Sequence, residues 1–173
     1  MLARLCEQQP LHRQHRLAEP SIHTDILDST NEMLVHLSLG LEKLNIGCLQ
    51  ALTVQGNTIT PSSSQSFSAI DTGTTLVGGP SSVIQSIFAQ IPGSAPGSGN
   101  WQGYWTYPCN TQVNIAISFG GPSWPIAPAD FQLTQLSSSQ CIGAFFELST
   151  GGSAPSWIVG DTFLVSAVVT CVV

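Results

Sequence analysis

AIDTGTTLVGGPSS, residues 69–82, places one acidic residue between a short apolar stretch and a cluster of glycine and hydroxyl side chains. In the simplest interpretation Asp71 is a turn residue that accepts backbone N–H groups, and a following glycine supplies a positive φ. The alternative is a catalytic carboxylate. The Asp-Thr-Gly tripeptide alone decides little, because it arises by chance in about 3% of chains of this length. The catalytic alternative is favoured by the strand-like residues 67–70 before Asp71 and by the hydroxyls of Thr74 and Thr75, which can hydrogen-bond a carboxylate or a substrate backbone.

Short strands and turns surround this stretch. Residues 113–119 alternate between apolar and polar side chains, which predicts a half-buried strand. Three further segments are strand candidates: 49–54, 141–148 and 156–160. One helix is expected, because Pro80 suits a first helical position and Pro92-Gly93 would end the helix. Between them the apolar residues form one stripe at helical spacing: Val83, Ile84, Ile87, Phe88 and Ile91. The pattern predicts a mainly β domain with one short helix.

Charge is distributed unevenly along the chain. Every Lys, Arg and His lies within the first 43 residues, whereas residues 44–173 hold four acids and no base, which gives a charge of −4. The four acids are Asp71, Asp130, Glu147 and Asp161. Nucleic acid is therefore not an expected partner, because phosphate binding needs Lys or Arg. This segment alone cannot build a Ser-His or Cys-His nucleophile, a His-rich zinc site or a Lys Schiff base. We expect no metal or other cofactor, and carboxylates remain for chemistry.

The 173 residues suit one domain, and their low share of charged residues, 8%, favours a β-rich protein. Residues 1–47 differ from the rest, with apolar residues at mostly helical intervals, and we expect them to be helical or disordered. No signal peptide is visible, because the N-terminus lacks an apolar run of about 7–15 residues. The apolar run 163–173 has 11 residues, short of the roughly 20 that a spanning helix needs. Neither end predicts membrane insertion.

Cysteine spacing gives no metal site, because no pair has CxxC spacing. The five cysteines are Cys6, Cys48, Cys109, Cys141 and Cys171. For Cys109 and Cys141 two options stay open from the sequence itself. They form a disulfide if the chain is exported, or they are buried free thiols.

Three stretches together resemble the C-terminal lobe of a pepsin-like (A1 family) aspartic peptidase, closest to the secreted fungal members. They are AIDTGTTLVGGPSSVIQSIFAQI (69–91), WTYPCNTQVNIAISFGGPSWPIAPADFQL (105–133) and QCIGAFFELSTGGSAPSWIVGDTFL (140–164). The resemblance covers residues 48–164. It implies a single all-β lobe, an aspartic endopeptidase acting on polypeptide substrates, no cofactor, and a secreted or vacuolar location.

The resemblance also implies roles for the residues of the Asp-Thr-Gly loop. Asp71 corresponds to the second catalytic aspartate of the family. Thr72 corresponds to the threonine that locks the two active-site loops together, and Gly73 to the glycine that allows the loop to turn tightly. Thr74 and Thr75 correspond to residues that contact the carboxylate and the substrate backbone.

Other positions correspond to structural features of the family. Ile158, Val159 and Gly160 match the hydrophobic-hydrophobic-glycine segment that passes behind the loop. Cys109 and Cys141 match the disulfide of this lobe, which would leave the other three cysteines free. Asp161 matches a structural aspartate, and we interpret Asp130 and Glu147 as solvated or hydrogen-bonded surface groups.

Two features depart from the family pattern. The sequence contains one Asp-Thr-Gly and no Asp-Ser-Gly, and residues 1–47 do not resemble the N-terminal lobe that supplies the first catalytic aspartate and the flap. Residues 165–173 form a divergent tail in place of the aromatic-rich strand of the family. We therefore expect a truncated half that needs the missing N-terminal lobe or a second chain for activity. The alternatives are an inactive β domain that at most binds peptides, and a homodimeric peptidase that uses Asp71 from each chain.

Overall fold

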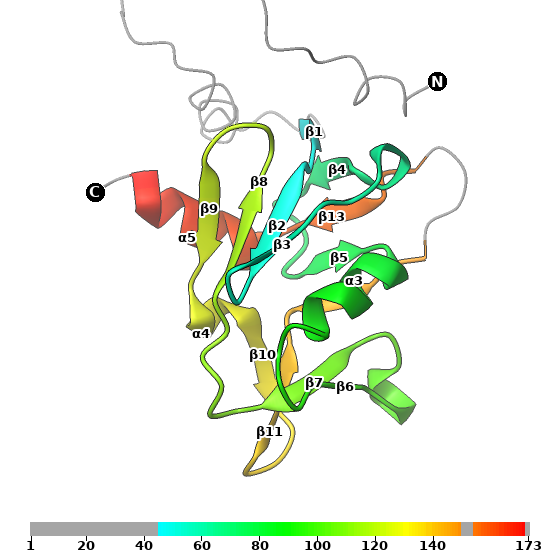
Figure 1. The fold of residues 1–173 in the computed structure, drawn as a ribbon, viewed down its shortest axis with the longest axis vertical. Coiled ribbons are helices and arrows are strands. Elements are labelled where there is room, and N and C mark those ends of the chain that lie inside the picture. Colours follow the sequence, from blue (N-terminus) through cyan, green and yellow to red (C-terminus); the bar gives the residue numbers. More distant parts are fainter. Residues whose placement is uncertain (1–44, 150–153, 172–173) are drawn as a thin grey trace, which may run out of the picture.

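The computed structural model describes residues 45–149 and 154–171. The expectation that residues 1–47 are helical or disordered is wrong for residues 45–47, which belong to a strand, and the rest of that expectation falls outside the described residues. Most of the elements are strands, and the helices are few and short (Figure 1). The predicted all-β lobe is confirmed. No helix in the described ranges is both long and apolar enough to cross a membrane.

A five-stranded sheet holds the Asp-Thr-Gly loop. Its strand order is β1-β4-β13-β5-β12. The bounds are β1 (Asn45–Cys48), β4 (Phe67–Ile70), β5 (Val77–Gly79), β12 (Phe145–Glu147) and β13 (Trp157–Val159). β13 pairs in parallel with β4 and antiparallel with β5. A segment from the C-terminal end of the described chain thus lies between the two strands that flank the loop.

Two four-stranded sheets complete the lobe, in the orders β10-β11-β7-β6 and β3-β2-β8-β9. The first contains β6 (Ala95–Pro96), β7 (Trp105–Pro108), β10 (Gln132–Gln135) and β11 (Gln140–Gly143). The second contains β2 (Ala51–Val54), β3 (Asn57–Ile59), β8 (Ile115–Ser118) and β9 (Ser123–Ile126). The predicted strands 49–54, 113–119 and 156–160 correspond to β2, β8 and β13, each with narrower bounds.

The single strand expected over 141–148 is wrong, because the chain changes sheets within it. β11 belongs to one sheet and β12 to another, with Ala144 between them. The Ala144 N–H donates to the Phe131 carbonyl (2.8 Å), and the Ala144 carbonyl accepts the Val77 N–H (3.1 Å). One residue therefore bonds to two different parts of the lobe, and the ladder cannot continue through it.

The predicted helix is α3 (Ser81–Phe88), with Pro80 as its N-cap. Four residues of the expected stripe are buried on it, and the fifth, Ile91, is buried just beyond it. α3 ends earlier than expected, because the Ser94 hydroxyl donates to the carbonyl of Phe88 (2.5 Å) and the chain turns away before Pro92. Two short 3-10 helices, η1 (Ser63–Gln65) and η2 (Gly99–Trp101), lie in the loops.

The structure adds two helices to the one expected, α4 (Pro128–Phe131) and α5 (Asp161–Cys171). α5 runs past the boundary expected after Leu164. Most of its first two turns is buried, and Val165 is the exception with 53% exposure. α5 contacts α4 and the strands β5, β9 and β13. Helical turns that are buried on nearly all sides need no polar stripe, so this part of α5 lacks the periodicity by which helices are usually found.

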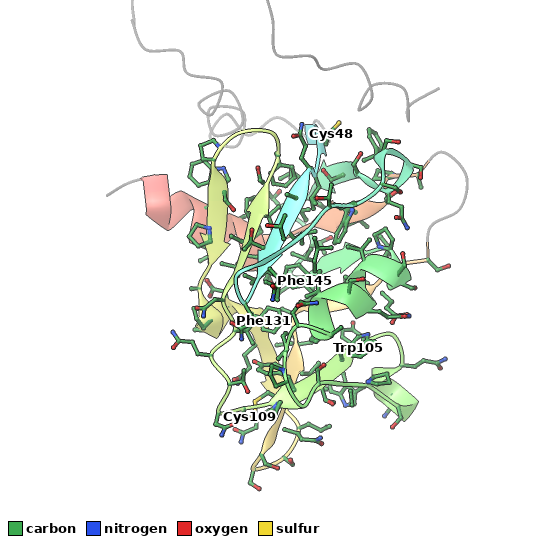
Figure 2. All side chains as sticks on the ribbon, viewed as in Figure 1. Cys48, Trp105, Cys109, Phe131 and Phe145 are labelled. Atoms are coloured by element: carbon green, nitrogen blue, oxygen red, sulfur yellow. A yellow bond between two sulfur atoms is a disulfide. The ribbon has the colours of Figure 1, made fainter. Side chains whose placement is uncertain are left out.

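Aromatic side chains link the sheets through the core (Figure 2). The Phe131 ring lies between those of Phe145 (centroid distance 5.6 Å) and Tyr107 (5.4 Å), and also contacts Phe88 (5.9 Å). Trp157 is fully buried, and its indole N–H donates to the Gln65 carbonyl (2.7 Å). The loop that holds Asp71 therefore rests on a well-packed core.

The predicted disulfide between Cys109 and Cys141 is present, with a Cα–Cα distance of 5.0 Å. It joins the start of the β7–β8 connection to β11. The expectation that Cys48 is free is wrong, because Cys48 is also disulfide-bonded. Figure 2 shows Cys48 and Cys109 at opposite ends of the lobe. Cys6 lies outside the described residues, and so does the side chain of Cys171.

Replacing both Cys109 and Cys141 by alanine should lower the free energy of unfolding by about 3–4 kcal/mol. The bridge closes a sequence separation of 32 residues, and the chain-entropy relation assigns a loop of this length that magnitude. Urea denaturation of the double variant measures the loss. The single Cys109→Ala variant should lose nearly as much. A double variant within about 1 kcal/mol of the parent protein would show that the bridge adds little.

Candidate functional site

Asp71 lies directly after β4, in the loop of residues 71–76 that leads into β5. Its backbone N–H donates to the Val159 carbonyl (3.0 Å) at the end of β13. The register places Ile158 beside Ala69 of β4 and beside Gly78 of β5. Asp71 therefore follows a strand, and the segment of Ile158, Val159 and Gly160 lies beside the two strands that flank the loop.

Both oxygens of the Asp71 carboxylate accept a hydrogen bond from the same loop. The Gly73 N–H donates to Oδ1 (2.9 Å), and the Thr74 hydroxyl donates to Oδ2 (2.6 Å). The Thr74 N–H also donates to the Asp71 carbonyl (3.3 Å). Asp71 is only partly buried. The loop thus fixes the orientation of the carboxylate and leaves it accessible to water or a ligand.

The interpretation of Asp71 as a turn residue is half right. Asp71 accepts a backbone N–H two residues later, as such turns do. Gly73, however, has no positive φ. A Cβ at position 73 would lie 3.2 Å from Oδ1 of Asp71. Glycine is favoured here because its backbone comes close to the carboxylate, and the turn itself does not require it.

Residues 160–162 bind the far side of the loop through backbone groups. The N–H groups of Gly160 and Asp161 donate to the carbonyls of Leu76 (3.1 Å) and Thr74 (2.9 Å). The Thr75 carbonyl accepts both the N–H (2.8 Å) and the hydroxyl (2.9 Å) of Thr162.

A Cβ on Gly160 would lie 2.0 Å from the Thr74 carbonyl oxygen, well inside contact distance. The absence of a side chain at this position therefore lets the loop pack against β13 and α5. Thr162 was not predicted from the sequence, since its role depends on a carbonyl distant in the sequence and no local pattern marks it.

Two other threonines of the loop face outward. Thr72 and Thr75 are exposed, and neither side chain has a hydrogen bond with a described residue. Their hydroxyls are therefore accessible for contacts with another polypeptide. Thr74 differs, because its hydroxyl is already bonded to Asp71.

Hydrogen bonding holds the pKa of Asp71 below its ordinary value of 3.8. The larger cause is the Thr74 hydroxyl and the smaller is the Gly73 N–H, while burial acts in the opposite direction. Both donors favour the ionised carboxylate. Since the pKa is lower in the folded protein, the resulting stabilisation is present above the pKa of the unfolded chain. It is lost as the pH falls through the pKa of the folded state.

Thr74→Val should raise the pKa of Asp71, because it removes the stronger donor and keeps a β-branched side chain of similar shape. A carbon-13 NMR titration of the Asp71 carboxyl group measures the change. Thr75→Val is the matched control, since the Thr75 hydroxyl does not contact Asp71. This variant should leave the pKa of Asp71 unchanged. Equal shifts in the two variants would contradict the assignment of the Thr74 hydroxyl as the main cause.

The other acids have separate partners. Asp130 accepts the Ser166 hydroxyl (2.7 Å), and Glu147 accepts the indole N–H of Trp105 (3.0 Å), so both are hydrogen-bonded groups as expected. Asp161 begins α5. Among residues 45–149 and 154–171, no second carboxylate hydrogen-bonds to Asp71, and no group of His, Cys, Asp and Glu could hold a metal ion. In the described part of the chain the site has one carboxylate.

Comparison with known proteins agrees with this geometry. The family model for eukaryotic aspartyl proteases matches residues 42–171. The major aspartyl peptidase 1 of Cryptococcus neoformans is 41% identical over 125 residues, which cover 67% of this chain and 26% of that protein. An aspartic protease of Phaffia rhodozyma is 42% identical over 123 residues, covering 67% of this chain and 29% of the relative.

Aspartic protease 1 of Caenorhabditis elegans is 33% identical over 98 residues, which cover 54% of this chain and 24% of that protein. This chain therefore spans about a quarter of the length of the relatives it matches. The matched region contains the whole Asp-Thr-Gly loop and the β13–α5 segment behind it. The chain belongs to the eukaryotic aspartyl protease family.

Proposed function

We propose that this chain supplies the C-terminal lobe of a pepsin-like aspartic endopeptidase, formed by residues 48–164, and that Asp71 is one of its two catalytic carboxylates. The observation that carries the proposal is the Asp71 carboxylate, which both Gly73 and Thr74 hold in a fixed orientation while it stays accessible. A simple surface turn would need only the hydrogen bonds within its own loop. Here β13 and α5 bond to the loop from behind at Asp71, Thr74 and Thr75.

The chemistry requires two carboxylates. In aspartic peptidases two aspartates share one proton: the ionised one activates a water and the protonated one polarises the scissile carbonyl. The two pKa values belong to the pair, because close carboxylates cannot both ionise easily. An isolated Asp71, whose pKa lies below its ordinary value, has no second carboxyl group with which to share a proton. The low pKa of Asp71 in this lobe would therefore be replaced by two split values once the second carboxylate is in place.

The remaining loop residues have distinct proposed roles. Thr72, exposed and without a partner in the described lobe, would bond to the corresponding loop of the other lobe. Gly73 and Thr74 hold the carboxylate, and Thr75 is available to a substrate backbone. Ile158, Val159 and Gly160 support the loop from behind.

Activity would need a second aspartate from another polypeptide segment. The 173 residues contain a single Asp-Thr-Gly and no Asp-Ser-Gly, which favours an N-terminal lobe or a second chain as its source. A homodimer would supply Asp71 twice. Without either, the lobe would at most bind peptides.

The two disulfide-bonded sites, at Cys48 and at Cys109–Cys141, support a secreted or vacuolar location, because disulfides persist in oxidising compartments.

Hydrolysis of a denatured protein by the purified 173-residue chain tests this assignment. At about pH 3–5, where aspartate pairs are singly protonated, the chain alone should show no hydrolysis that an inhibitor of the pepstatin kind can block. If the chain alone shows such hydrolysis and Asp71→Asn abolishes it, the proposal that this chain needs a second aspartate from another polypeptide segment is contradicted. A rate rising more steeply than linearly with protein concentration would then indicate the homodimer.

A further inference from the structure

A cavity of about 460 Å³ opens on a side of the lobe that the Asp71 loop does not reach. Its lining comes from the start of β8, the end of β9, the β2–β3 turn, α4 and α5, and includes no residue of 67–79 or 157–160. Figure 1 shows β8, β9, α4 and α5 grouped on one side of the lobe. We call it the Asp130 cavity, after its one acidic lining residue. Its volume lies within the range of small-ligand pockets, about 300–1,000 Å³.

Most of the Asp130 cavity is apolar. Ala116 of β8 and Pro125 of β9 are paired and accessible to solvent in its lining. Ile115 and Ile126 lie behind them, each 2% exposed, with their side chains in the core. Val165, 53% exposed on α5, adds an apolar side chain that solvent can reach. Apolar walls of this kind can contact the methylene groups of a long side chain.

One carboxylate is held in place within these walls. The Ser166 hydroxyl donates to Oδ2 of Asp130 (2.7 Å), and the same hydroxyl oxygen accepts the Ala127 N–H (2.9 Å). Asp130 is partly exposed, and no described residue donates to its Oδ1. Residues 44–173 contain no Lys, Arg or His. Any cation that binds Asp130 must therefore come from outside this segment.

We propose that the Asp130 cavity binds a lysine or arginine side chain of a polypeptide, at a site separate from the Asp71 loop. The aliphatic stem lies along Ala116, Pro125 and Val165, and the charged head bonds to Oδ1 of Asp130. A charged hydrogen bond with a fixed acceptor adds more affinity than a neutral one. Gln112 and Asn114, both exposed in the lining, offer amide groups to the backbone of the bound peptide. Binding at this site does not depend on the proposed peptidase activity.

NMR titration of the nitrogen-15-labelled 173-residue chain tests the proposal with two acetylated tripeptide amides, Leu-Lys-Leu and Leu-norleucine-Leu. The second peptide lacks only the ammonium group. The lysine peptide should bind about tenfold more tightly, the effect expected of one charged hydrogen bond. Its largest chemical-shift changes should fall on Ala116, Ile126 and Val165. Equal affinities of the two peptides, or shifts centred elsewhere on the lobe, would overturn the proposal.

Two variants with the same change in net charge separate the cavity from general attraction by an acidic protein. Asp130→Asn should abolish the preference for lysine, and Asn can still accept the Ser166 hydroxyl. Glu147→Gln should keep the preference, because Glu147 is outside the lining. Equal weakening in both variants would mean that net charge alone attracts the peptide. Val165→Lys, at an exposed position, should also reduce binding about tenfold by placing a competing cation at the cavity, and full binding by this folded variant would equally count against the proposal.

Discussion

Gly160→Ala is expected to unfold the lobe or to lower its free energy of unfolding by about 4 kcal/mol or more, a large part of the 5–15 kcal/mol typical of a domain. A Cβ at this position would lie 2.0 Å from the Thr74 carbonyl oxygen, 2.6 Å from the Thr74 carbonyl carbon and 2.7 Å from the Leu76 carbonyl oxygen. These are backbone atoms, so no side-chain rotation can relieve the overlap. Relief requires the 71–76 loop to move away from β13 and α5, and that movement breaks the hydrogen bonds that residues 160–162 make to it.

Gly47→Ala is the matched control. Gly47 lies in β1 of the same sheet, and a Cβ there would make ordinary contact, 3.5 Å from the Phe119 ring and 3.6 Å from the Ser68 hydroxyl. The control should change stability by less than about 1 kcal/mol. Urea denaturation followed by circular dichroism compares the two variants. A Gly160→Ala protein as stable as the Gly47→Ala protein would contradict the close packing of the loop on this segment.

Local pattern was sufficient to predict some elements and the place of Asp71. The stripe that begins at Val83 predicted α3, because a helix with one buried face shows its period in the sequence. Alternation between apolar and polar residues around Ile115 predicted β8 for the same kind of reason. The apolar segment before Asp71 predicted a strand that ends at the carboxylate. In each case the contacts that decide the structure are repeated at a regular spacing.

Other features depend on contacts between distant parts of the chain. Ala144 divides an apolar run into two strands, since its N–H and carbonyl bond to Phe131 and Val77. α5 contains several β-branched residues and its first two turns are mostly buried, so neither propensity nor periodicity predicts a helix there. The pairing of Cys109 with Cys141 followed only from the family resemblance, because cysteine spacing alone leaves the partners open.

The residues of the site could be predicted from the sequence, but most of the contacts between them could not. The residues themselves indicated Asp71 and its neighbouring threonines, and the family resemblance indicated the segment that passes behind them. It did not show that Gly73 is needed for the approach of a carboxylate, or that Thr162 donates twice to the Thr75 carbonyl. These features come from backbone positions that tertiary packing sets.

We propose that Asp71 becomes a catalytic carboxylate once a second aspartate faces it. A chimera supplies the second aspartate under controlled conditions. The 123-residue segment of the Phaffia rhodozyma aspartic protease that matches this chain is replaced by the matching residues of this chain, and the rest of that protease is kept. The exchange is drawn to include residues 69–164 of this chain, which hold the Asp-Thr-Gly loop, β13 and the start of α5.

Hydrolysis by this chimera at about pH 3–5, with and without Asp71→Asn, is the most direct measurement. We predict hydrolysis that a pepstatin-type inhibitor blocks, and a fall in kcat of about 10²–10⁴-fold in the Asp71→Asn chimera, the range for loss of a general acid or base. Glu147→Gln, which also removes one acid and keeps an acceptor for Trp105, should retain the activity of the parent chimera. A folded chimera whose activity survives Asp71→Asn, or one that never hydrolyses substrate, would contradict the assignment of Asp71 as a catalytic aspartate.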